Sequence, residues 1–163
     1  MVMRPYTGFD GNIKRPLPSM NRFIDYCTFL TEGGLWNNGS YGVRPMRGKE
    51  SESIHGTGRA VDLSWRKTVL GRGRRGYGDW WRAAEFSEFL IRHADDLEIE
   101  LILDYTPRPW GRGWRCDRGE WINYSKKTIA GAPMGDWLHI EISPAAAHNP
   151  GFYDQAFRKV FGV

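Results

Sequence analysis

An imidazole and a carboxylate lie seven residues apart in the stretch Ser53-Ile54-His55-Gly56-Thr57-Gly58-Arg59-Ala60-Val61-Asp62-Leu63. Glycine adopts backbone conformations that other residues avoid, so the two glycines of this stretch allow a loop to present His55. From Arg59 onward the residues alternate, and Val61 and Leu63 face the side opposite to Asp62. The stretch therefore predicts a loop followed by a strand, with an apolar side on the core and Asp62 facing a cleft.

A second strand of the same kind is predicted in Gly135-Asp136-Trp137-Leu138-His139-Ile140-Glu141-Ile142. Its leucine and isoleucines occupy one face, so His139 shares the other face with Trp137 and Glu141. Two adjacent strands of this type aim Asp62 and His139 at one point, which His55 reaches from its loop. Two histidines and one aspartate form a three-ligand set suited to Zn²⁺, with the fourth position left for water, as in catalytic sites.

The pattern Ser53-x-His55-x-x-Gly58-x-Ala60-x-Asp62-Leu63, followed by Asp136-x-x-His139, resembles a family of zinc peptidases. This family includes D-alanyl-D-alanine carboxypeptidases and dipeptidases, and the L-alanyl-D-glutamate endopeptidases of bacteriophage lysins. Its fold is shared with the hedgehog signalling domain. The resemblance implies an α+β fold in which a small antiparallel sheet carries the zinc site and about three helices flank it.

The resemblance also implies roles for individual residues. His55, Asp62 and His139 match the zinc ligands, and Asp136 matches the general base. Many carboxypeptidases and dipeptidases of the family carry glutamate at the place of Asp136, whereas the lysin endopeptidases carry aspartate. The chain is therefore closest in pattern to the lysin peptidases.

Further residues are expected around this site. Arg44 resembles the arginine that polarises the scissile carbonyl, and Arg47 is a rival for that role and a candidate substrate contact. Ser53 and Glu141 are expected to support the ligands, and Glu141 is the alternative base if Asp136 is too short to reach. Three tryptophans are expected to form a wall of the substrate cleft, namely Trp110, Trp114 and Trp137.

Two Gly-rich basic segments, residues 63–78 and 107–115, are predicted as loops. The first either grips phosphate or an anionic wall polymer, or is a solvated mobile loop. Aromatic side chains beside arginine in the second can stack on sugars or bases, or can cap a small core. The net charge of +4 favours an acidic partner without distinguishing wall polymers from nucleic acid.

The length of 163 residues, with 40% hydrophobic and 14% aromatic residues, predicts one folded domain over residues 1–163, with 1–17 as an extended N-terminal arm. Helices are expected over 19–31, 79–93 and 150–161, with Ser19, Asp79 and Asn149 as caps. Strands are expected over 98–105 and near 41–44. Cys27 and Cys116, the only cysteines, are expected to be free thiols, with Cys27 in the core.

Neither a signal peptide nor an apolar run of roughly 20 residues is visible, so no membrane partner is expected. The predicted function is that of a bacteriophage endolysin endopeptidase: a monomeric hydrolase made in the cytoplasm that acts on bacterial peptidoglycan once released. Two alternatives are a D-alanyl-D-alanine carboxypeptidase of the same family and a non-catalytic zinc-binding or nucleic-acid-binding module. Nucleic acid is not the expected partner, because neither helix-turn-helix nor zinc-finger spacing is present.

Overall fold

The computed structural model describes residues 3–48, 51–70 and 73–162, and within them it has an α+β architecture. One antiparallel sheet carries six strands in the order β1-β2-β8-β5-β6-β7. The strands in that order are β1 (Trp36–Gly39), β2 (Ala60–Ser64), β8 (Trp137–Ile142), β5 (Ile99–Asp104), β6 (Arg112–Arg115) and β7 (Trp121–Asn123). The predicted α+β class with a small antiparallel sheet is confirmed.

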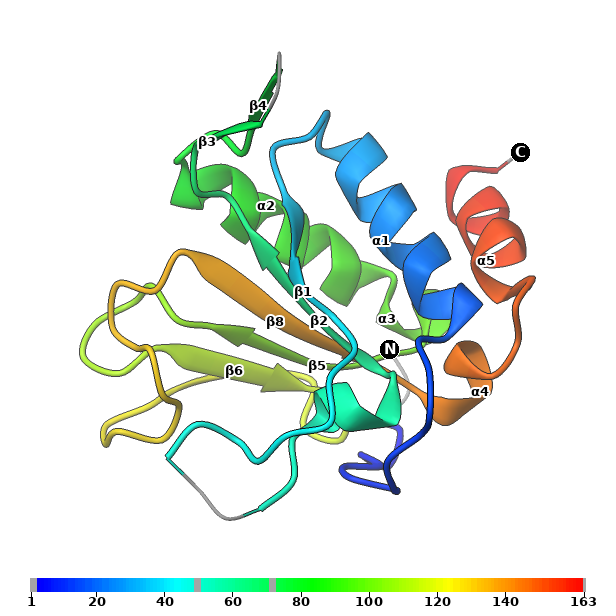
Figure 1. Cartoon of the computed structure of the whole chain (residues 1–163), viewed down its shortest axis with the longest axis horizontal. Helices are drawn as coiled ribbons and strands as arrows, with labels where there is room; N and C mark the ends of the chain where they lie inside the picture. Colours follow the sequence, from blue (N-terminus) through cyan, green and yellow to red (C-terminus); the bar gives the residue numbers. More distant parts are fainter. Residues whose placement is uncertain (1–2, 49–50, 71–72, 163) are drawn as a thin grey trace.

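Helices cover one face of this sheet (Figure 1). They are α1 (Pro18–Leu30), α2 (Trp80–Arg92), α3 (Ala94–Leu97), α4 (Pro144–Ala147) and α5 (Phe152–Phe161). The core lies between the helices and the apolar faces of β2 and β8, where Val61, Leu63, Leu138 and Ile140 are fully buried. The opposite face of β2 and β8 is thereby left for polar side chains.

The three predicted helices correspond to α1, α2 and α5 within two residues at each end. Asp79 caps α2 as predicted, because its carboxylate accepts a hydrogen bond from the Trp81 amide at 2.8 Å. Ser19 does not cap α1: the helix starts one residue earlier, and the buried Ser19 hydroxyl donates to the Ala146 carbonyl. Asn149 does not cap α5, whose N-cap is Gly151.

The predictions did not include the helices α3 and α4, the strands β1, β6 and β7, or the strands at residues 68–70 and 73–75. The helices α3 and α4 span four residues each, which is too few to produce a periodic apolar pattern. The strand near 41–44 was predicted in the wrong place, since β1 occupies residues 36–39 and segment 41–44 contains no strand.

The predicted strand over 98–105 is present as β5, but its residues do not alternate strictly between the two faces of the sheet. A β-bulge lies between Ile99 and Leu101. As a result, Ile99 and Ile102 both face the core, while Leu101 and Leu103 are half-buried on the other face. A strict alternation of residues could not reveal this shift.

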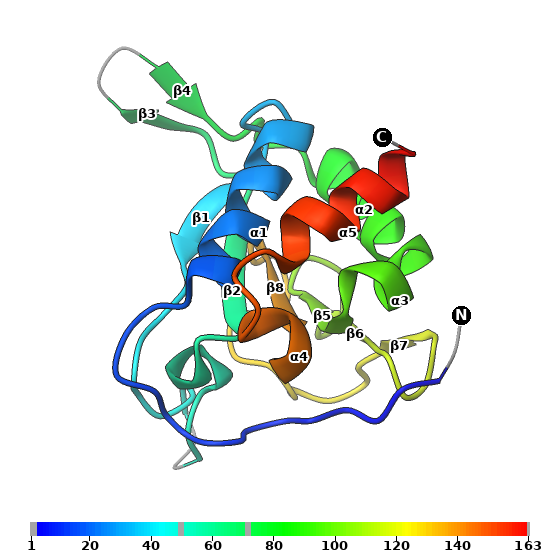
Figure 2. The same cartoon turned by 90° about the vertical axis from the view of Figure 1, so that its right-hand side faces the viewer.

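The first basic segment is a β-hairpin where it was predicted to be a mobile loop. Strands β3 (Thr68–Leu70) and β4 (Gly73–Arg75) pair with each other, and the hairpin projects from the body of the molecule (Figure 2). Arg74 and Arg75 are exposed on it. Residues 71 and 72, including the Arg72 of this segment, lie outside the described residues.

Residues 3–17 contain neither helix nor strand and pass along one edge of the molecule (Figure 2). Arg59, whose side chain is fully buried, donates to Asp10 at 3.1 Å and to the Gly8 carbonyl of this segment.

The free thiols of Cys27 and Cys116 are buried, as predicted for Cys27 in the core. None of the helices in the described part of the chain is both long and apolar enough to cross a membrane.

Candidate metal centre

Three potential metal ligands meet on the face of the sheet opposite the helices. Asp62 of β2 and His139 of β8 are direct cross-strand partners, with Asp62 Oδ1 3.0 Å from His139 Nδ1. His55 approaches from the 3-10 helix η1 (Ile54–Thr57), and its Nε2 lies 3.4 Å from Asp62 Oδ2. One ligand atom from each residue lies within 4.8 Å of the others. The predicted convergence of these residues is confirmed.

The sequence around His55 fixes the direction of its ring. The Ser53 hydroxyl caps η1 by accepting the His55 amide at 3.3 Å, so Ser53 supports this ligand through its backbone. Gly58 ends η1 with a φ of +74°, a conformation that favours glycine. The carbonyl of Ser40 accepts a hydrogen bond from His55 Nδ1. That bond leaves Nε2 as the ring atom that faces Asp62.

His139 lies between two carboxylates. Glu141 Oε1 is 3.0 Å from His139 Nε2, and the other oxygen of Glu141 accepts a 2.8 Å hydrogen bond from the Tyr6 hydroxyl. Burial alone would lower the pKa of His139, but its hydrogen bonds with Asp62 and Glu141 raise it to about 10. A metal ion that binds Nδ1 must therefore displace a proton.

Asp62 and Tyr6 keep the protonation states that the metal site requires of them. Burial alone would raise the pKa of Asp62, but the hydrogen bonds from His139 and His55 hold it well below its usual range. Burial, followed by the charge of Glu141, raises the pKa of Tyr6. Asp62 is thus a carboxylate at neutral pH, and Tyr6 is a neutral hydroxyl donor.

The donor set fits zinc in its chemistry, and its ligand atoms lie near one another. Ligand atoms about 2.0–2.1 Å from a tetrahedral Zn²⁺ are separated from one another by about 3.3 Å. The 3.0 Å and 3.4 Å separations join the two histidine nitrogens to different oxygens of Asp62, and one ligand atom from each residue lies within 4.8 Å of the others, so small side-chain movements would bring the three to this spacing. Two imidazoles and one carboxylate leave a fourth position for water, and a cavity opens beside them.

This cavity has a volume of about 390 Å³. It is lined by the three potential ligands and by five of the eight other residues expected at the site, namely Arg44, Arg47, Ser53, Trp137 and Glu141. The Trp137 ring stacks on Tyr105 with centroids 4.5 Å apart. Arg44 and Arg47 are exposed, so cations border the cavity on one side.

Further lining residues were missed by the sequence analysis. They are Tyr105 and the segment 128–130. The predicted strand over 98–105 ends at Tyr105. Because Leu103 of that strand is the cross-strand partner of His139, Tyr105 could have been placed near His139. Nothing in the sequence signalled segment 128–130, because it is a loop brought to the site by tertiary contacts alone.

Two of the three tryptophans predicted to line the cleft, Trp110 and Trp114, do not line this cavity. The prediction for Trp114 is wrong. Trp114 is 1% exposed in the core, because Gly113 takes the cavity-side position of β6 and turns Trp114 towards the helices. Trp110 is half-buried in the turn before β6. The arginine Arg112 from the same segment is paired with buried Asp104 at 3.1 Å. Trp114 of this segment therefore packs in the core, which was the alternative left open for the aromatic residues there.

Asp136 lies at the edge of the site, before the first residue of β8. Its carboxylate is 3.5 Å from the Ser64 hydroxyl and 3.8 Å from Arg66 Nε. Ser64 is two residues beyond Asp62 on the same face of β2. The Asp136 carboxylate does not line the cavity, whereas that of Glu141 does.

Comparison of the chain with protein-family models, with curated proteins and with solved structures found no match. The inference of function therefore depends on the residues of the site and on their geometry.

Proposed function

We propose that this protein is a zinc peptidase that hydrolyses a peptide bond in the stem peptide of peptidoglycan. Within that class, we propose the L-alanyl-D-glutamate endopeptidase type of bacteriophage lysins, with a hedgehog-like fold. One observation carries the proposal: His55, Asp62 and His139, the three ligands that the motif requires, meet at one cavity although 84 residues separate the first from the last.

The chemistry of peptide hydrolysis fits the groups around the cavity. Zinc, when bound, supplies a water of pKa about 7 and polarises a carbonyl oxygen. His55, Asp62 and His139 would hold the ion. Arg44 and Arg47 border the same cavity, where either guanidinium can stabilise the negative charge that develops on the scissile carbonyl.

A carboxylate is needed to take the proton from water and pass it to the leaving amine. Asp136 is proposed for this role. Its side chain is half-exposed. Its hydrogen bond with Ser64, at 3.5 Å, and its ion pair with Arg66, at 3.8 Å, are both long, so the carboxylate can turn towards a substrate. Glu141 is the rival base because it lines the cavity, but both of its oxygens are already hydrogen bonded to His139 and Tyr6.

The cavity suits an extended acidic peptide. The two arginines at its border complement carboxylates of the kind that D-glutamate carries in the stem. Its apolar wall, formed by Trp137, Tyr105, Leu103 and Ile129, can cover the short aliphatic side chains of alanine. An endopeptidase must admit chain on both sides of the cleaved bond, and a surface cavity with exposed arginines permits this.

We expect digestion of purified peptidoglycan to produce new amino termini on D-glutamate. The zinc-loaded protein would be incubated with peptidoglycan, the new amino groups labelled, and the labelled fragments identified by mass spectrometry. The His139→Ala protein, treated in parallel, is the control for contaminating hydrolases. Release of free D-alanine without any internal amino terminus would replace the proposal with the carboxypeptidase of the same family. No product of either kind would contradict the peptidase function.

A further inference from the structure

Tyr6 is linked to the potential metal ligand His139 through a single intervening side chain. Its hydroxyl donates to Glu141 Oε2 at 2.8 Å, and Glu141 Oε1 lies 3.0 Å from His139 Nε2. Glu141 is 3% exposed, so water can do little to hold its carboxylate. Among the described residues, Tyr6 and His139 are the two side chains hydrogen bonded to Glu141.

The N-terminal segment holds Tyr6 firmly at this place. The guanidinium of Arg115 lies 4.7 Å from the centre of the Tyr6 ring and is itself fixed by two 2.7 Å hydrogen bonds to Asp117. Before Tyr6, Arg4 donates to Glu98 at 2.9 Å. After it, the Thr7 hydroxyl donates to Glu100 at 2.6 Å. These contacts fix the backbone on both sides of Tyr6.

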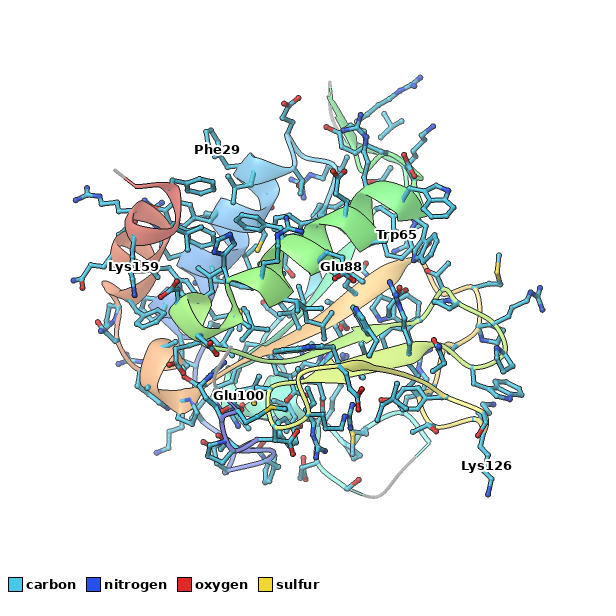
Figure 3. All side chains as sticks on the ribbon, turned by 180° about the vertical axis from the view of Figure 1, so that it is seen from behind. Phe29, Trp65, Glu88, Glu100, Lys126 and Lys159 are labelled. Carbon is cyan, nitrogen blue, oxygen red and sulfur yellow. The ribbon has the colours of Figure 1, made fainter. Side chains whose placement is uncertain are left out.

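Glu141 is also subject to the charge of a second carboxylate, Glu100. Glu100 is 2% exposed on the neighbouring strand β5, and Figure 3 shows it beside the N-terminal segment. The two negative charges repel each other, and Arg59, 3.4 Å from Glu100, offsets part of that repulsion. Without the Tyr6 hydroxyl, one oxygen of Glu141 would be buried with no partner, and the carboxylate would tend to turn away from His139.

The orientation of Glu141 matters for the metal site. A carboxylate that accepts the Nε2–H of a histidine fixes the ring and leaves Nδ1 as the ligand atom. In this structure Nδ1 is the His139 atom that faces Asp62. We propose that Tyr6 is a positioning residue for the metal centre: it holds Glu141 so that His139 presents Nδ1 towards Asp62 and the ion. This inference rests on the proposed zinc function and adds the N-terminal segment to the site.

The test is a double-mutant cycle on the zinc dissociation constant, measured by competition with a chromophoric chelator. We expect Tyr6→Phe to weaken zinc binding by about tenfold, at the lower end of the effects seen for residues that support metal ligands. Glu141→Gln is expected to weaken it at least as much. If Tyr6 acts through Glu141, Tyr6→Phe should add almost nothing in the Glu141→Gln background.

Tyr41→Phe is the matched control. The Tyr41 hydroxyl donates to the Ile13 carbonyl at 2.7 Å, so it anchors the same N-terminal segment without touching Glu141. It should leave the zinc dissociation constant unchanged, and urea unfolding of each metal-free variant separates loss of stability from loss of affinity. Unchanged zinc binding in Tyr6→Phe, or additive effects in the double variant, would overturn the role of Tyr6 alone. A wild-type protein that binds no zinc would overturn both this role and the proposed function.

Discussion

Replacing His55, Asp62 or His139 by alanine is expected to raise the zinc dissociation constant by a factor on the order of 10² to 10³. Binding of zinc in four-ligand sites is worth about 10–16 kcal/mol at pH 7, so one ligand of the set accounts for about 2.5–4 kcal/mol, and each 1.4 kcal/mol is about tenfold. Equilibrium dialysis followed by metal analysis measures the occupancy of each variant at a fixed free zinc concentration.

His93→Ala provides the control for a histidine outside the site. His93 follows the last residue of α2 and packs on the Phe89 ring, with centroids 4.9 Å apart. Its replacement should leave one zinc bound per chain. Full occupancy in the His139→Ala protein would show that this residue is not a ligand, even if the other two variants behaved as expected.

Asp136→Asn is expected to keep zinc and the fold while lowering turnover by a factor on the order of 10² or more, because general-base catalysis is typically worth 10²–10⁴. Within the described residues, the Asp136 carboxylate makes only long polar contacts, at 3.5 Å to Ser64 and 3.8 Å to Arg66, so its loss should disturb the structure little. Turnover is measured on peptidoglycan at saturating zinc, so that a change in metal affinity does not enter the comparison.

Glu141→Gln, measured under the same conditions, distinguishes the two carboxylates. As a support for His139, Glu141 should affect the zinc dissociation constant more than turnover at saturating zinc. Near-normal turnover in Asp136→Asn, combined with a loss of 10² or more in zinc-saturated Glu141→Gln, would move the role of base to Glu141.

The two strands that carry Asp62 and His139 could be predicted from the sequence because both are short and alternate between apolar and polar residues. In each of them the apolar residues, such as Val61 and Ile140, occupy every second position and are completely buried. A period of two residues then fixes the side to which the ligand points. The pairing of Asp62 with His139 followed once the two strands were placed side by side.

Residues whose position depends on tertiary structure were predicted less well. Trp114 was assigned to the cleft because its segment is rich in glycine and arginine, but the register of β6 against β5 pairs it with Ile102 in the core. The bulge in β5 likewise puts Ile99 and Ile102 on the core face and Leu101 and Leu103 on the other face, which strict alternation does not predict. Register and bulges arise from contacts between strands, and the sequence of one strand does not contain them.

The contribution of the N-terminal segment to the site could not be predicted either. Tyr6 lies 135 residues from Glu141 in the sequence, and the two are joined by one hydrogen bond. Residues 1–17 show no periodic pattern, so nothing in the sequence indicates which of their side chains turn inward. Only the three-dimensional structure shows that Tyr6 contacts Glu141, which in turn contacts His139.

The most direct test of the zinc centre formed by His55, Asp62 and His139 is a metal titration of hydrolysis. The protein would be stripped with a chelator and dialysed, and zinc would then be added in steps while the release of amino groups from purified peptidoglycan is followed. Hydrolysis should be absent from the stripped protein, rise in proportion to added zinc and reach its plateau at one zinc per chain. Full hydrolysis by the stripped protein, or none at one zinc per chain, would contradict the proposal that this cluster is a catalytic zinc centre.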